Sequence, residues 1–102
     1  MRNYSPEFTV RHCTVDFLVF CVWNTEEGIH DAIKESRPLY SAVLDKVLPA
    51  ENEHQYYVDQ VSAMTRNLKA IKAELERRHA LKLDVEWTIS SLINEANQFI
   101  NE

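Results

Sequence analysis

Three of the four histidines stand three residues after a glutamate. The pairs are Glu27 and His30, Glu51 and His54, and Glu76 and His79. Residues spaced by three share one face of a helix, so a carboxylate and an imidazole at this spacing can bind a common ion. Iron, zinc or manganese would accept these ligands.

The isolated pairs resemble those of ferritin-like di-iron bundles, which add glutamates from facing helices. Two of the three pairs lie about 37 Å apart on one expected helix, so they cannot share a site within one chain. A metal site would need other pairs to meet across a bundle or a dimer axis: Glu26, Glu27 and His30 with Glu51 and His54. The alternative is capping and solvated ion pairs, because acids favour the first turn of a helix. We favour this alternative and expect no cofactor.

The composition predicts a single helical domain over residues 1–102. The chain has 102 residues, 45% of them apolar, with one glycine and three prolines. Strand-and-turn folds need glycine where the backbone takes positive φ, and helical folds need it less. We therefore expect an all-α fold, with shorter elements over 1–49 and a helical hairpin over 50–102.

The hairpin is predicted from two apolar seams. The first recurs in alternating steps of four and three, at Tyr57, Val61, Met64, Leu68, Ile71 and Leu75. It indicates one long helix over about 50–79, with glutamates in its first turns and cations near its end. The second seam, at Val85, Ile89, Leu92, Ala96 and Phe99, indicates a helix over about 85–101 with Asp84 as its N-cap. The short link "ALKL" implies that the two helices are antiparallel.

The first half of the chain should cover the apolar surface that the predicted hairpin leaves exposed. Thr25 can cap a helix that presents Ile29, Ala32 and Ile33 on one face. Pro38 disfavours helix at the residue before it, so a break or kink is expected there, followed by a short helix over 38–48.

Residues 6–23 allow two interpretations. Ser5, Pro6 and Glu7 form a typical helix start, whereas the many β-branched residues and alternating apolar positions that follow are typical of a strand. We favour a helix, with a β-hairpin or an intersubunit strand as the alternative. A helix over 15–23 would be apolar all round except for Asp16, which suits the centre of a bundle or a subunit interface. We therefore expect a homodimer or higher oligomer.

Charge, hydropathy and cysteine spacing argue against nucleic-acid-binding, membrane-spanning and cysteine-ligated metal proteins. The net charge is −5 and is spread evenly, which disfavours nucleic acid as the main partner. The exception is a run of cations at Arg66, Lys69, Lys72, Arg77, Arg78 and Lys82, read either as helix-end residues or as a weak nucleic-acid patch over 66–82. The run "VDFLVFCVW" is too short to span a bilayer, and Cys13 and Cys21 show no metal spacing. A cytoplasmic protein is the expectation.

No catalytic constellation is present, so we expect a small interaction module rather than an enzyme. Inhibitors, immunity or antitoxin-like proteins and adaptors are the classes that fit. A basic protein is the expected partner, and its binding site is placed at Glu26, Glu27, Asp31 and Glu35. Trp23 and Trp87 are most simply core anchors, but either could be an interface hot spot. The alternative function is a metal-binding helical bundle.

Overall fold

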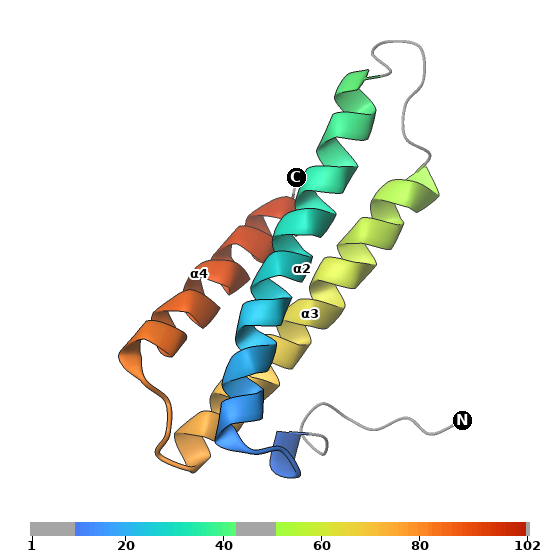
Figure 1. Ribbon diagram of the computed structural model, residues 1–102. Coiled ribbons are helices and arrows are strands. Elements are labelled where there is room, and N and C mark those ends of the chain that lie inside the picture. The colour runs from blue at the N-terminus through green and yellow to red at the C-terminus, as the bar shows by residue number, and fades with distance from the viewer. Residues whose placement is uncertain (1–9, 43–50, 102) are drawn as a thin grey trace, which may run out of the picture.

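The computed structural model describes the backbone of residues 10–42 and 51–101, and the side chains of residues 10–36 and 55–101. Within these ranges it is all-helical, as predicted: α2 spans Val15–Ala42, α3 spans Glu51–Arg77 and α4 spans Leu83–Ile100. The three helices pack side by side, and Figure 1 shows α3 running opposite to α2 and α4. None of the described helices is long and apolar enough to cross a membrane.

The core forms where the apolar seams of the three helices meet. The predicted seam of α4 is buried throughout. In the predicted seam of α3, Val61, Leu68, Ile71 and Leu75 are buried and Met64 is half-buried. Helix α2 contributes four buried residues to the core, at Leu18, Val22, Ile29 and Ala32. Their spacing is close to that of the seams of α3 and α4. Because each helix presents one apolar stripe, the stripes cover one another around a common axis.

The start of α2 corrects the prediction for residues 6–23. Residues 15–23 are helical, so the strand alternative is wrong for them, while the predicted start at Ser5 lies outside the described residues. Thr14 caps the helix: its hydroxyl accepts from the backbone N–H of Phe17 at 3.1 Å. β-branched residues lower helix propensity only slightly, and burial of Leu18 and Val22 against the bundle outweighs that cost.

Two predicted boundaries within the first half are wrong. Thr25 does not begin a helix, because its hydroxyl donates instead to the carbonyl of Cys21, one turn earlier in α2, at 2.6 Å. Pro38 does not end the helix either, since α2 continues to Ala42. A proline removes one backbone hydrogen bond, a loss that a long packed helix tolerates. Residues 43–48 of the predicted short helix lie outside the described residues.

The helix predicted over 50–79 is confirmed as α3, which ends two residues early in a Schellman motif. The N–H of His79 donates to the carbonyl of Glu76 at 3.0 Å, and that of Ala80 donates to Leu75 at 2.8 Å. His79 has φ of 55°, the left-handed conformation that glycine usually supplies. The cap of α4 differs from the prediction: the N-cap is Lys82, without a side-chain bond, and Asp84 lies in the first turn.

Substitution of His79 by glycine is expected to raise the free energy of unfolding by about 0.5–1 kcal/mol, because glycine adopts positive φ without a Cβ clash. The matched control is Glu76→Gly, in the helical part of the same turn, which should lower it by about 1 kcal/mol. Urea unfolding followed by circular dichroism measures both. A His79→Gly protein less stable than the wild type would show that the imidazole itself stabilises this turn.

Candidate functional site

The outward face of α2 carries an exposed aromatic patch, which we define as Phe17, Phe20 and Trp23. Their exposed fractions are 51%, 55% and 39%. The rings of Phe17 and Phe20 lie with centroids 6.3 Å apart. At 100° per residue these positions fall on the side of α2 opposite to Leu18 and Val22, so the bundle cannot cover them. Residues 15–23 are therefore buried on one face only and do not lie in the centre of the bundle, while the alternative of a subunit interface stays a prediction.

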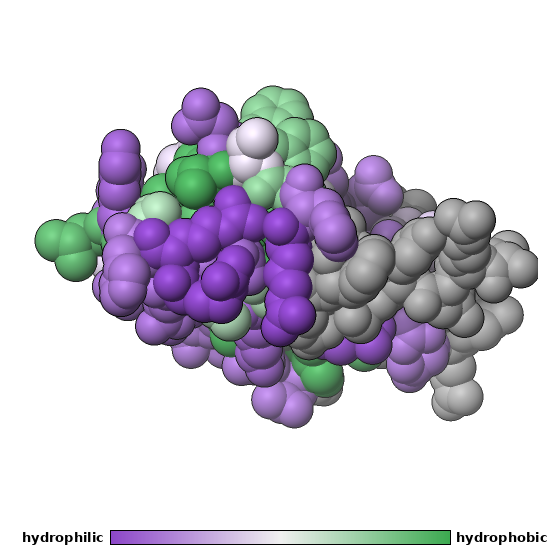
Figure 2. All heavy atoms as spheres, turned by 90° about the horizontal axis from the view of Figure 1, so that it is seen from below, coloured by the Kyte–Doolittle hydropathy of each residue, from purple (hydrophilic) through white to green (hydrophobic). Residues whose placement is uncertain are grey.

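The patch lies toward the end of the molecule where α2 begins and where α3 connects to α4 (Figure 1). Figure 2 views the bundle from this end and shows hydrophobic side chains reaching the surface among hydrophilic ones. Large exposed aromatic side chains of this kind are typical of protein interaction sites.

An acidic row continues the outward face of α2 beyond the aromatic patch. We define it as Glu27, Asp31 and Glu35, which are all exposed and repeat every four residues, one turn apart. Glu26, also predicted to bind a partner, is half-buried. The exposed Lys34 is a cation on the same helix. The structure thus places the four predicted acidic residues on a single helix, directly after Trp23.

Trp87 is 72% exposed on α4, and Leu83, one turn earlier, is 83% exposed. The interpretation of Trp23 and Trp87 as core anchors is wrong. Helices α2 and α4 run in the same direction (Figure 1). His30 of α2 pairs with Glu95 of α4. Trp23 and Trp87 each lie about two turns before that pair, so they occupy the same level of neighbouring helices.

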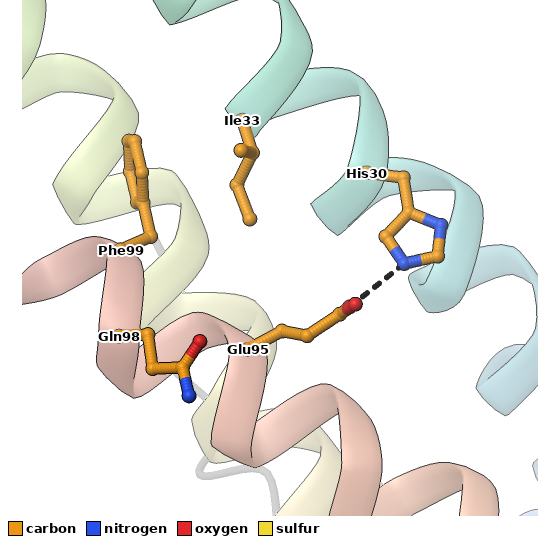
Figure 3. Close-up of a pocket in the computed structure, with 5 residues that line it drawn as sticks. All are labelled: His30, Ile33, Glu95, Gln98 and Phe99. Atoms are coloured by element: carbon orange, nitrogen blue, oxygen red, sulfur yellow. Dashed lines mark hydrogen bonds and ion pairs between the residues drawn. The ribbon is translucent and has the colours of Figure 1, made fainter.

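The imidazole of His30 bonds to a residue of another helix. Its Nε2 lies 2.8 Å from Oε2 of Glu95, and both side chains are about half exposed. The pair lines a hollow of about 200 Å³ together with Ile33, Gln98 and Phe99. Figure 3 shows the side chains of His30 and Glu95 pointing toward each other from α2 and α4. Half-exposed pairs of this kind contribute little to stability, about 0–1 kcal/mol.

The Glu-x-x-His pairs do not form a common ligand set among the described residues. The side chains of Glu51 and His54 lie outside the described ones. Glu76 is exposed, and His79 belongs to the turn after α3. No group of three or more potential ligands gathers anywhere in the part of the chain that the structure describes.

A charged cluster fixes the segment before α2 to the end of α3. Glu74 is only 4% exposed and accepts from Arg77 at 2.5 Å and from Arg78 at 2.6 Å. The guanidinium of Arg78 also donates to backbone carbonyls of the segment before α2, at Cys13 (2.7 Å), Val10 (3.0 Å) and Arg11 (3.2 Å). Two of the six cations in the predicted 66–82 patch are therefore engaged within the fold.

The same cluster predicts a pH dependence. Hydrogen bonds from Arg77, which has the larger effect, and from Arg78 lower the pKa of Glu74 from 4.5 to about 2. Since the pKa is lower in the folded state, ionised Glu74 stabilises the fold at pH values above 4.5, and this stabilisation is lost as the pH falls toward 2.

The test is an acid titration followed by circular dichroism, with urea added to bring the transition into range. Glu74→Gln should be less stable at neutral pH, and its stability should fall less steeply below pH 4.5 than that of the wild type. Parallel pH profiles for the two proteins would contradict this role of Glu74.

Cys13 and Cys21 are both half-buried. Burial, and to a lesser extent the neighbouring Cys13, raise the pKa of Cys21. A raised pKa disfavours the reactive thiolate. The Cys21 thiol therefore lacks the electrostatic setting of an activated nucleophile.

Comparison with known proteins gives no relative: no protein-family model, curated protein or solved structure matches this chain.

Sequence reasoning missed Phe17, Phe20 and Glu95 as surface or site residues. The spacing of Phe17, Phe20 and Trp23 in steps of three was the available signal, because it marks one helix face separate from that of Leu18 and Val22. No sequence pattern indicated the hydrogen bond between His30 and Glu95, because it depends on how α2 and α4 are aligned along their length.

Proposed function

We propose that this protein is a protein–protein interaction module that binds its partner through the outward face of α2. The observation that carries the proposal is the exposed aromatic patch directly followed by the acidic row on the same helix. Exposed aromatic side chains supply most of the energy of many interfaces, and flanking charges select and steer the partner.

The partner should present an apolar surface next to a basic one. Glu27, Asp31 and Glu35 would attract cations, which also raises the association rate at low salt. Trp87 and Leu83 extend the apolar area onto α4 at the level of Trp23. Binding of a partner protein through one helix face is the role of a small inhibitor, an immunity or antitoxin-like protein, or an adaptor.

A second copy of the chain is the alternative occupant of the aromatic patch. Light scattering at micromolar concentration distinguishes the two occupants. A homodimer that dissociates on Phe20→Ser would assign the patch to self-association, whereas a monomer leaves it available for another protein.

The binding experiment is a pull-down from the native host with wild-type bait and two variants. Phe17→Ser/Phe20→Ser removes the aromatic patch, and Glu27→Lys/Asp31→Lys reverses two charges of the acidic row. Both should fold normally, since these side chains are exposed. We expect the aromatic variant to lose the partner at all salt concentrations and the charge variant to lose it most strongly at low salt. Recovery of the same partner by all three baits would contradict the proposal.

A further inference from the structure

A second surface feature lies between α2 and α3, where a groove of about 300 Å³ opens to solvent. Its acidic side is formed by Asp31 and Glu35 of α2, and its aromatic side by Tyr56 and Tyr57 of α3. We infer that this groove binds an arginine side chain of the partner protein. The inference rests on the proposed function, because it assigns a chemical group to the acidic row.

The only glycine of the chain lies in this groove. Gly28 occurs within α2, where glycine costs about 1 kcal/mol relative to alanine. A Cβ at this position would lie 2.9 Å from Sδ of Met64 on α3. The absent side chain thus lets the two helices approach closely, with Met64 over the glycine, while the carboxylates and tyrosines stand around the hollow.

The aromatic side is arranged to receive a flat cation. Tyr56 is 56% exposed, and its ring meets that of Tyr57 edge-on, with centroids 5.3 Å apart. The hydroxyl of Tyr57 faces Oε2 of Glu35 across the groove, at the long distance of 3.5 Å. A guanidinium stacks on an aromatic face and bonds carboxylates with its fork of N–H donors.

Charge and size agree with this occupant. No cation lines the groove among the described residues, so its two carboxylates produce an uncompensated negative potential there. The groove volume of about 300 Å³ is about ten times the volume of one water in the liquid, about 30 Å³, so a guanidinium head group has room there. An anionic or purely apolar side chain would leave the carboxylates desolvated without a partner.

The test is a nuclear magnetic resonance titration of the full chain with Nα-acetyl-arginine amide, following the backbone amides of Gly28, Asp31 and Tyr56. The neutral comparison is Nα-acetyl-citrulline amide, which has nearly the same shape. We expect saturable shifts confined to the groove for arginine, with a dissociation constant on the order of 1 mM, and none for citrulline.

Two double variants remove equal charge. Asp31→Asn/Glu35→Gln should weaken arginine binding about tenfold, whereas Asp16→Asn/Glu76→Gln, at exposed sites outside the groove, should change it less than about twofold. Equal shifts for arginine and citrulline, or equal weakening by both double variants, would overturn the inference. Because the probe is a small molecule, failure here is distinct from failure of the pull-down with the aromatic variant.

Discussion

Leu68→Ala is expected to lower the free energy of unfolding by about 3 kcal/mol, the largest effect of any single change that we consider. Leu68 is fully buried in the middle of α3, within the core that all three helices share. Truncation removes buried methyl groups and leaves a cavity that the surrounding helices fill only in part. A small domain has only about 5–15 kcal/mol of stability, so the loss is a large share.

The matched control for Leu68→Ala is Leu83→Ala, the same chemical change at a site that is 83% exposed. Its effect should stay within about 0.5 kcal/mol. Chemical denaturation followed by circular dichroism measures both variants. Equal effects would mean that Leu68 does not occupy the core of the protein.

Arg78→Ala is expected to produce the second-largest loss, about 2–3 kcal/mol. Its guanidinium bonds the buried Glu74 and three backbone carbonyls of the segment before α2. Removal takes one donor away from Glu74, which keeps Arg77, and takes the guanidinium donor away from each of the three carbonyls. The attachment of that segment to the end of α3 is weakened as a result. Hydrogen bonds to charged groups contribute more than neutral ones, and buried groups left unsatisfied add a further penalty.

The control for Arg78 is Arg77→Ala. Arg77 also bonds Glu74, but its side chain is 61% exposed, and none of its described hydrogen bonds reaches a backbone carbonyl. Its loss should cost clearly less than that of Arg78. Thermal unfolding of the two variants gives the comparison, and hydrogen exchange at Cys13 should accelerate in Arg78→Ala alone. Similar melting temperatures for both variants would contradict the assignment of the anchor to Arg78.

The sequence predicted the parts of the fold that depend on periodicity. The seam of α4 is buried as expected. Apolar residues that recur in alternating steps of three and four all lie on one face of a helix, and that face packs against the other helices. The errors at Thr25 and Pro38 have a common cause. Both residues carry local boundary signals, and a long helix packed along two neighbours overrides such signals.

The candidate site was predicted only in part. Its acidic residues follow from helical spacing, and the structure places them on α2. The exposure of Trp23 and Trp87 depends on which side of each helix meets the others. Tryptophan side chains are largely buried on average, so the residue type alone suggests burial. Only the packing of the three helices shows that these two rings reach the surface.

The most direct measurement of the central proposal is site-specific photocross-linking in the native host. A photoreactive benzoylphenylalanine replaces Phe20 of the aromatic patch in one strain, and Lys69, an exposed residue of α3, in another. We expect a discrete covalent adduct with one partner protein from position 20 and none from position 69. The absence of an adduct at position 20, or the same adducts from both positions, would contradict the proposal that the outward face of α2 is the binding surface.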